Sequence, residues 1–292
     1  MRSLLFVPGD SEKKLTKALQ AGADVLLLDL EDSVGPDRKA DARKITSSFI
    51  SENGKQASTA LYVRVNDFTT GLTDDDLAAV MPARPAGIML PKAIGPTDVM
   101  RLSAKLRVHE AENGIADGAT RMVAIIAETA AGVLAAPAFS EAQPRLTGVT
   151  WGAEDLSADL GARMPRDGDG RYTDTFRLAR TLTILAAATV QAAAIDTVFV
   201  NFRDADALRA ECVEAERDGF TAKMAIHPAQ VPIINEVFTP STESVAHSRA
   251  VVDAFTAAGN PGVIGIDGQM YDRPHLRRAE RILARAKAAG VA

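Results

Sequence analysis

The chain has 292 residues, of which 47% are hydrophobic and 24% are charged, and its formal net charge is −5. This composition is ordinary for a globular protein with a sizeable core, and the acidic balance argues against a general nucleic-acid-binding surface. A single cysteine, Cys212, excludes an internal disulfide framework and a cysteine-rich metal site. No apolar stretch approaches the about 18 residues of a membrane span, and no signal peptide precedes the Pro8–Gly9 turn. We therefore expect a cytoplasmic location and no membrane partner.

Eight short apolar runs follow one another along the chain and predict strands. Each run is bounded by turn or polar residues and is apolar on both faces, which is typical of parallel strands buried on two sides. The runs are residues 3–9, 25–32, 61–66, 87–92, 122–128, 146–155, 197–201 and 222–228.

The segments between these runs are rich in Ala, Leu, Lys, Arg and Glu, which favours helices. Residues 12–22 are one such segment, with Gly22 as a candidate C-cap, and residues 175–193 are another. Residues 162–174 are polar and glycine-rich and predict a long loop after the sixth strand. Beyond the eighth strand, helices are expected over 244–259 and 276–290.

Eight strand–helix units predict a (β/α)8 barrel over residues 1–239, followed by a C-terminal helical extension over 240–292. A doubly wound open sheet is the alternative, but such sheets more often have five or six strands. Because no low-complexity linker interrupts the chain, we expect one domain with a C-terminal extension.

The polar residues that end the eight runs are the candidates for a functional site, because barrels of this kind carry their sites at the C-terminal ends of the strands. Side chains alternate along a strand, so Asp29 and Glu31 are expected on one face and Asp32 on the other. The candidates are Asp29, Glu31, Arg64, Asn66, Lys92, Glu128, Glu154, Asp155, Asn201 and His227.

Several carboxylates at one rim, with few histidines and no cysteine cluster, favour a hard divalent cation. Oxygen ligands select Mg²⁺, with Mn²⁺ as an alternative, over zinc. Magnesium usually takes only one or two protein carboxylates, so not all of these acids need to be ligands.

Seven motifs in a fixed order carry a resemblance to a known family. They are RSLLFVPG, LDLEDSV, VRVN, MLPK, IAETAAGV, GAEDLSADLG and GFTAKMAIHPAQVPIINEVFTPS, and the match runs from Arg2 to the region around His275. Together they resemble the citrate lyase β-subunit-like family of the HpcH/HpaI aldolase group, which includes malyl-CoA and citramalyl-CoA lyases. The resemblance implies a TIM barrel of the phosphoenolpyruvate-binding type. It also implies Mg²⁺-dependent cleavage or formation of a C–C bond in a 3-hydroxyacyl thioester, usually of CoA.

The same resemblance implies roles for individual residues. Glu128 and Asp155 would be the two metal carboxylates, and Arg64 would bind the oxo-acid end and the carbonyl of the substrate. Asp272 would act as a base in the site of a neighbouring subunit, which implies that the C-terminal extension packs on that subunit in a homotrimer or homohexamer. The backbone that would hold the substrate carboxylate is that of Gly152, Ala153, Glu154 and Asp155.

Structural readings compete with these roles. Glu128 and Asp155 could cap helices, because acids favour helix N-termini. Arg64 could form a salt bridge with acids of the rim. Asp29 and Glu31 are interpreted as supporting groups that hold metal-bound water or Arg64, and Asp32 as a cap or loop anchor.

Three further residues could contact CoA. Pro8 and Gly9 could shape an anion-binding turn before a helix, and Lys13, with Lys14 beside it, could meet phosphates. The alternative for these lysines is a solvated helix face.

Lys92 raises the possibility of a Schiff-base aldolase, which needs a lysine with a lowered pKa. A metal site makes a Schiff base redundant, so we favour an exposed lysine or a partner for a carboxylate.

We predict a Mg²⁺-dependent lyase that converts malyl-, citramalyl- or citryl-CoA to acetyl-CoA and an oxo acid, with an added thioesterase step as an option. One alternative is a metal-dependent aldolase acting on free hydroxy-oxo acids. Others are a β subunit of a citrate lyase complex acting on an acyl-carrier-protein thioester, and a barrel that binds a ligand without catalysis. The acyl group is not determined by the sequence, because a methyl group in a pocket changes the binding free energy by only about 1–3 kcal/mol.

Overall fold

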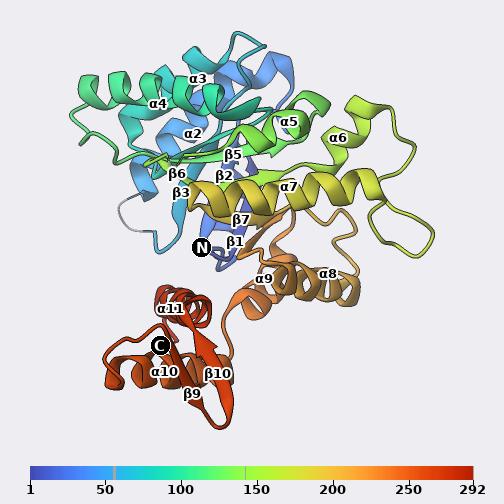
Figure 1. Cartoon of the computed structure of the whole chain (residues 1–292). Helices are drawn as coiled ribbons and strands as arrows, with labels where there is room; N and C mark the ends of the chain where they lie inside the picture. Colours follow the sequence, from blue (N-terminus) through green and yellow to red (C-terminus); the bar gives the residue numbers. More distant parts are fainter. Residues whose placement is uncertain (55–56, 142, 292) are drawn as a thin grey trace.

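The computed structural model describes residues 1–54, 57–141 and 143–291. Eight parallel strands close into a barrel in sequence order, with β1 paired to both β2 and β8 (Figure 1). The predicted (β/α)8 barrel is therefore confirmed. The barrel strands are β1 (Ser3–Pro8), β2 (Val25–Asp29), β3 (Ala60–Arg64), β4 (Gly87–Leu90), β5 (Arg121–Ala127), β6 (Leu146–Trp151), β7 (Ala193–Asp196) and β8 (Ala222–Ala225).

Helices surround the barrel and continue beyond it. The α-helices are α1 (Glu12–Ala18), α2 (Lys39–Asn53), α3 (Thr73–Val80), α4 (Gly95–Glu112), α5 (Ala130–Ala135), α6 (Ala153–Leu160), α7 (Asp174–Val190), α8 (Ala205–Asp218), α9 (Val231–Phe238), α10 (Thr242–Ala257) and α11 (Arg273–Ala288). Short 3₁₀ turns are η1 (Pro36–Arg38), η2 (Met81–Ala83), η3 (Ala136–Ala138) and η4 (Pro228–Gln230), and a hairpin is formed by β9 (Val263–Ile266) and β10 (Gln269–Asp272). Among the described residues, no helix has the length and apolar character needed to cross a membrane.

The seventh predicted strand is wrong, whereas the other seven runs overlap observed strands. β7 lies at 193–196, and residues 197–201 form the loop that leads to α8. Helix α7 ends at Val190, and the left-handed backbone of Gln191 (φ 57°) turns the chain directly into the strand. The alanine-rich sequence before β7 favours a continued helix. Pairing of β7 with its two neighbouring strands, Ala193 with Gly148 of β6 and Asp196 with Lys223 of β8, outweighs that helix propensity.

The predicted C-cap at Gly22 is also wrong. Helix α1 ends at Ala18 with Leu19 as its cap. Gly22 instead has a φ of 73° in the turn before β2, a conformation that glycine adopts without steric cost. The predicted loop over 162–174 is present and contains an isolated bridge between Arg166 and Tyr172.

A buried charged network lies between the last barrel strands and their helices. Lys223 and Asp196 are both 0% exposed, and the ammonium of Lys223 lies 2.7 Å from a carboxylate oxygen of each of Asp196 and Glu211. The indole N–H of Trp151 donates to Asp196 over 2.9 Å. This network ties β6, β7, β8 and α8 together directly behind the end of β6.

We expect Lys223→Met to lower the free energy of unfolding by about 3–5 kcal/mol, because it leaves Asp196 buried without its main counter-ion. Urea unfolding followed by circular dichroism measures the change. Lys105→Met is the control, since Lys105 pairs with the exposed Asp74 and should cost no more than about 1 kcal/mol. Equal losses in the two variants would contradict the prediction.

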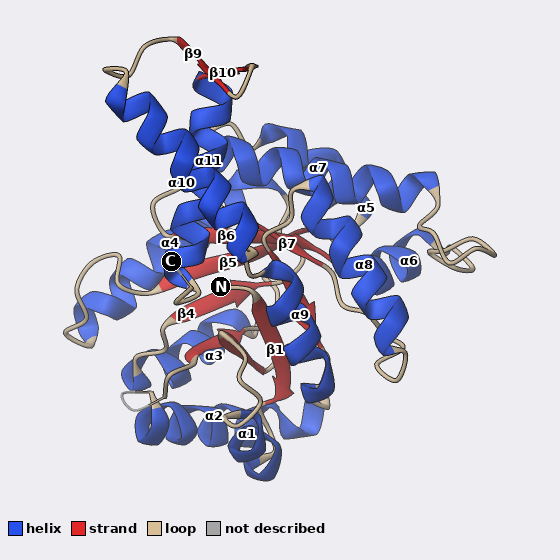
Figure 2. Ribbon diagram, turned by 90° about the horizontal axis from the view of Figure 1, so that it is seen from below, coloured by secondary structure: helices blue, strands red, loops and turns tan. Residues whose placement is uncertain are grey.

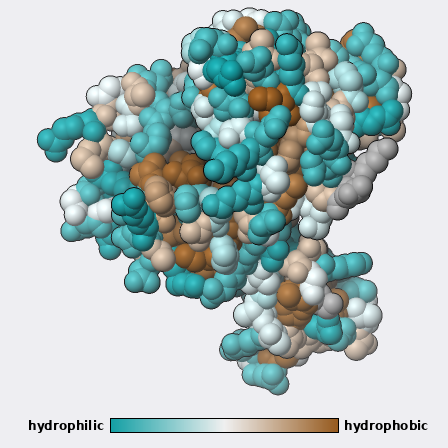
Figure 3. All heavy atoms as spheres, turned by 180° about the vertical axis from the view of Figure 1, so that it is seen from behind, coloured by the Kyte–Doolittle hydropathy of each residue, from teal (hydrophilic) through white to brown (hydrophobic). Residues whose placement is uncertain are grey.

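The C-terminal segment forms a small unit of its own below the barrel. Helices α10 and α11 and the β9–β10 hairpin enclose a separate apolar cluster that includes Val251, Phe255 and Leu276. The hairpin was not predicted, because residues 262–275 are rich in glycine and lack a long alternating pattern. Figure 3 shows this unit projecting from the barrel body with hydrophobic atoms on its surface. In the hairpin, Val263 and Met270 are 52% and 68% exposed.

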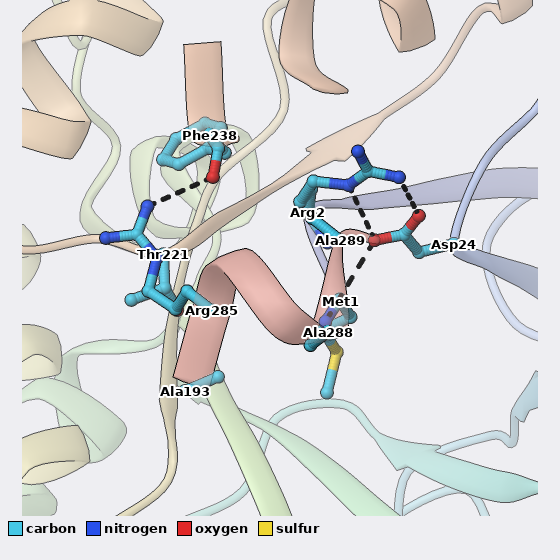
Figure 4. Close-up of a pocket in the computed structure, with 9 residues that line it drawn as sticks. All are labelled: Met1, Arg2, Asp24, Ala193, Thr221, Phe238, Arg285, Ala288 and Ala289. Atoms are coloured by element: carbon cyan, nitrogen blue, oxygen red, sulfur yellow. Dashed lines mark hydrogen bonds and ion pairs between the residues drawn. The ribbon is translucent and has the colours of Figure 1, made fainter. Parts of the chain in front are cut away.

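The end of α11 meets the base of the barrel at the N-terminal ends of the strands. Seen from below, the two chain termini lie together there (Figure 2). A cavity of about 190 Å³ separates Ala288 and Ala289 from Met1, Arg2 and Asp24 (Figure 4). Arg2 closes one side through a bidentate pair with Asp24 at 2.7 and 3.1 Å. The C-terminal unit is therefore attached to the face opposite the C-terminal strand ends.

Candidate active site

The predicted site residues gather at the C-terminal ends of strands β2 to β6. Asp29 and Arg64 are the last residues of β2 and β3, and they lie opposite each other in the parallel register. Glu128 follows β5 directly, and Gly152 joins β6 to α6, whose first turn carries Asp155. Because the strands are parallel, their short connections deliver all of these groups to one rim.

Arg64 is held by two acids of the β2 end. Its Nε and Nη2 donate to the two carboxylate oxygens of Asp29, both at 2.7 Å, in the fork geometry that arginine and carboxylate favour. Its Nη1 lies 2.8 Å from Glu31 Oε2, and the guanidinium stands 4.7 Å from the centre of the Phe6 ring. The structure thus confirms the predicted salt bridge between Arg64 and acids of the rim, and these contacts fix the orientation of the guanidinium.

Asp29 is a fully paired buried carboxylate. Besides Arg64, it accepts hydrogen bonds from the backbone N–H of Glu31 at 2.9 Å and of Ser33 at 3.1 Å. Burial opposes its ionisation, but the charge and hydrogen bonds of Arg64 outweigh burial and hold its pKa below the usual value. Asp29 therefore acts as an anchor for Arg64.

Glu31 is less well compensated than Asp29. Burial raises its pKa to about 7, although the Arg64 and Lys92 cations act in the opposite direction. Its Oε2 lies close to Arg64 but lacks hydrogen-bond geometry, so this buried oxygen has no hydrogen-bond partner among the described residues. This oxygen is therefore compensated by the charge of Arg64 and not by an aligned hydrogen bond.

The expected position of Asp32 on the opposite face is wrong. Its carboxylate lies 3.8 Å from Arg64 and 3.6 Å from Lys92, on the same side as Glu31. The alternation rule does not apply, because β2 ends at Asp29 and the following residues form a turn. Asp32 is thus an exposed member of the same acidic group.

Glu128 and Asp155 face each other across Gly152. Glu128 Oε2 and Asp155 Oδ2 lie 3.0 and 3.6 Å from the point that a Cβ atom on Gly152 would occupy. That Cβ would also stand 2.8 Å from the Cβ of Glu128, so only glycine fits between the two acids. Burial, followed by the charges of Asp155 and Glu31, raises the pKa of Glu128 to about 8, and burial also raises the pKa of Asp155.

These two acids fit a magnesium ion. No group of three or more His, Cys, Asp or Glu side chains converges as a metal site in the described ranges. Two carboxylates are nevertheless what Mg²⁺ usually takes from a protein, with water and substrate oxygens completing its shell. Burial is the main cause of the raised pKa of each acid, and a divalent cation would stabilise the buried carboxylates in their charged form.

Lys92 lies inside this acidic group, as one of the two favoured sequence readings predicted. Its ammonium contacts Glu31 and lies 3.9 Å from Asp155, and its backbone N–H donates to Glu128. The favoured reading as a carboxylate partner is confirmed. The available signal was the position of Lys92 just past the end of β4, at the same rim as the acids.

Two supports of the β6 end were also missed. Thr197 accepts a hydrogen bond from the backbone N–H of Ala153 at 3.3 Å, and Asp196 accepts from Trp151. Both acceptors lie at or just after the end of β7, whose boundaries the sequence misplaced. They hold the strand–helix turn that presents Asp155.

Gly9 lies at the same rim, where its N–H donates to Asp29 O over 2.8 Å, whereas Lys13 and Asp272 lie outside the acidic group. Gly9 packs tightly, because a Cβ there would meet Thr46 Oγ1 at 2.6 Å and Asp29 O at 2.7 Å. Lys13, on α1, is exposed. Asp272 is the last residue of β10 and the N-cap of α11, in the unit below the barrel, and its carboxylate contacts His275 at 2.6 Å.

Comparisons with known proteins point to one family. The model of HpcH/HpaI aldolase/citrate lyase matches residues 2–228. A (3S)-malyl-CoA thioesterase of Cereibacter sphaeroides is 35% identical, with 98% of this chain and 95% of the relative covered. A mitochondrial citramalyl-CoA lyase of Rattus norvegicus is 32% identical, with 98% and 86% covered.

A solved structure is similar over the same span. It is CitE from Mycobacterium tuberculosis in complex with magnesium, acetoacetate and coenzyme A. It is 33% identical, with a TM-score of 0.76, and 98% of each chain is covered.

Proposed function

Because the chain belongs to the HpcH/HpaI aldolase/citrate lyase family, we propose that it is a Mg²⁺-dependent carbon–carbon lyase acting on a 3-hydroxyacyl-CoA thioester. The substrate is of the malyl-, citramalyl- or citryl-CoA type, and the products are acetyl-CoA and an oxo acid. The observation that carries the proposal is the Glu128–Asp155 pair across Gly152, beside an oriented Arg64 at the same rim.

Glu128 and Asp155 are the residues that would hold Mg²⁺. When bound, the ion polarises substrate oxygens and stabilises negative charge on them, which lowers the barrier to cleavage. Burial raises the pKa of Glu128 to about 8, and a bound cation would favour the charged form of this carboxylate.

Arg64 and the turn after β6 would orient the substrate. The planar fork of Arg64, fixed by Asp29, suits the oxo-acid end of the substrate and its developing carbonyl. The N–H groups of Gly152 and Ala153 already donate to Ala127 O and to Thr197. The backbone donors for the substrate carboxylate are therefore proposed to be those of Glu154 and Asp155, in the first turn of α6.

Cleavage requires a base for the substrate hydroxyl. The hydroxyl proton leaves, the bond between C2 and C3 breaks, and its electron pair moves to the thioester as an enolate, which then takes up a proton. C3 becomes the carbonyl of the oxo acid. Arg64 remains protonated, because neighbouring acids outweigh its burial and raise its pKa, so it is a donor and not the base. A carboxylate is a competent base once the hydroxyl is polarised.

We propose that Asp272 of a neighbouring subunit supplies this base. In its own chain, Asp272 belongs to a unit that packs on the N-terminal ends of the barrel strands, whereas Glu128 and Asp155 lie at the C-terminal ends. The packed barrel therefore lies between Asp272 and the Glu128–Asp155 pair of the same chain. The exposed Val263 and Met270 beside Asp272 suit burial against another copy, in a homotrimer or homohexamer.

A mixing experiment tests this shared site. Asp272→Asn and Glu128→Ala are each expected to be inactive alone, and mixing them with subunit exchange should restore part of the activity through sites with both native groups. Light scattering measures the oligomeric state. Full activity of Asp272→Asn alone, or a monomer that remains active, would contradict the arrangement.

The activity itself is tested by incubating the protein with malyl-, citramalyl- and citryl-CoA, with Mg²⁺ or with EDTA, and following release of the oxo acid and acetyl-CoA. Turnover that depends on Mg²⁺ is expected for at least one thioester. Free hydroxy-oxo acids and acyl-carrier-protein thioesters test the two alternative substrates. No turnover of any CoA thioester would reject the proposal.

A thioesterase is the second candidate, favoured by the 35% identity to the (3S)-malyl-CoA thioesterase. It predicts release of free CoA and malate without an oxo acid, which chromatography of the same reactions distinguishes.

A further inference from the structure

Lys92 has a backbone conformation that is unusual for lysine. Its φ of 50° lies in the left-handed region, which residues with a side chain rarely adopt. This conformation directs its N–H at Glu128 Oε1, so the backbone orients one proposed metal carboxylate. Strain of this kind is retained where the surrounding structure requires it, and it clusters at functional sites.

The side chain of Lys92 serves the other acids of the rim. Its ammonium contacts Glu31 Oε1 and lies 3.6 Å from Asp32 and 3.9 Å from Asp155. Across the described ranges it is the one cation at ion-pair distance from Asp155. Arg64 pairs with Asp29 and also reaches Glu31 at 2.8 Å and Asp32 at 3.8 Å. Within the described part of the chain, the charge that Lys92 alone balances is therefore that of Asp155, one of the two proposed metal carboxylates.

We propose that Lys92 is a built-in counter-cation of the metal site, which neutralises the acidic group between metal-binding events and weakens the affinity for Mg²⁺. The inference rests on the proposed magnesium site. Because an ammonium so near Asp155 repels an incoming divalent cation, Mg²⁺ binding proceeds against its charge. Lys92 thereby keeps the ion exchangeable while its pairing with Glu31 preserves the geometry of the site.

The deciding measurement is the affinity of Lys92→Met for Mg²⁺ alone, by isothermal titration calorimetry. Methionine keeps an unbranched side chain without the charge, and the backbone N–H to Glu128 is retained. We expect Lys92→Met to bind Mg²⁺ about tenfold more tightly than wild type, because even water-screened repulsion at this range is worth that much. A merely structural lysine predicts the opposite, since a disorganised site binds the ion more weakly.

Two further variants serve as controls for the Mg²⁺ titration. Lys92→Arg keeps the positive charge and should leave the Mg²⁺ affinity close to that of wild type. Lys105→Met removes an equal charge from a half-buried position on α4, outside the proposed site, and should leave the Mg²⁺ affinity unchanged, which excludes an effect of net charge. Thermal melts establish that each variant is folded.

The outcomes separate this inference from the proposed function. Unchanged or weaker Mg²⁺ binding by folded Lys92→Met overturns the counter-cation role, while Mg²⁺-dependent turnover by wild type leaves the lyase proposal standing. Failure of every variant, and of wild type, to bind Mg²⁺ overturns both. If Lys92→Met does not fold, tighter binding by Lys92→Gln supports the role, and equal or weaker binding overturns it.

Discussion

Glu128→Gln is expected to lower kcat/KM by more than about 100-fold and to remove Mg²⁺ binding. Groups that only support a metal ligand already cost about 10- to 100-fold when mutated, so loss of a direct carboxylate ligand should cost more. Asp155→Asn should act in the same direction, because the two acids face each other across Gly152. Calorimetric titration with Mg²⁺ and steady-state kinetics on the preferred thioester measure the two effects.

The stability of the metal-free protein separates loss of the ion from misfolding. Burial raises the pKa of Glu128 to about 8, above its usual value. The folded state therefore favours the protonated carboxyl, and stability falls as pH rises from about 4.5 towards 8. Glutamine carries no charge at any pH, so Glu128→Gln in EDTA should melt no lower than wild type at pH 8.

Glu52→Gln, at an exposed position on α2, is the control and should match wild type in Mg²⁺ binding and turnover. Retention of tight Mg²⁺ binding by Glu128→Gln, or equal losses in the control, would contradict the assignment of the metal site.

Arg64→Lys is expected to lower kcat/KM by about 100- to 1,000-fold with a smaller effect on folding. Lysine keeps the positive charge beside Asp29 and Glu31 but cannot form the bidentate fork. A loss of about 100- to 1,000-fold corresponds to about 2.7–4 kcal/mol, which lies within the about 2–5 kcal/mol that truncation of one partner in a buried, hydrogen-bonded charge pair typically costs. Kinetics at saturating Mg²⁺ isolate the effect on the substrate.

Arg64→Ala should also be destabilised, by about 3–5 kcal/mol, because Asp29 would be buried without a counter-ion.

Arg145→Lys is the matched control for Arg64→Lys. Arg145 is buried and paired with Glu110 at 2.7 Å, but it precedes β6 at the opposite end of the barrel. This variant should lose some stability and keep its kcat/KM. Similar kinetic losses in Arg64→Lys and Arg145→Lys would mean that Arg64 acts only through folding.

Most barrel elements were predictable because their signals are local. Apolar runs bounded by turn residues locate seven strands, and parallel pairing follows from the helical segments between them. β7 was not predicted at its true position, because its four residues, AAID, follow an alanine-rich helix and carry no strand signal of their own. The β9–β10 hairpin was missed for a similar reason, since Gly265 and Gly268 favour a loop.

By itself, the sequence determined which acids and which arginine reach one rim, because strand ends in a parallel barrel share one face. Position at or just after a strand end selected Glu128, Asp155 and Arg64 among ten candidates. The resemblance of seven ordered motifs, and not spacing, assigned their roles. The family match over residues 2–228 agrees with that resemblance.

Only the tertiary structure decided how the rim charges are distributed. Contacts among residues from β2, β3 and β4 pair Asp29 with Arg64, bring Asp32 to the same side, and insert Lys92 among the acids. It also decided that Asp272 lies below the barrel, away from its own site. The physical reason is that the residue at each strand end can be read along the chain. Which charged side chains pair depends instead on turn geometry and on the packing of side chains that are distant in sequence.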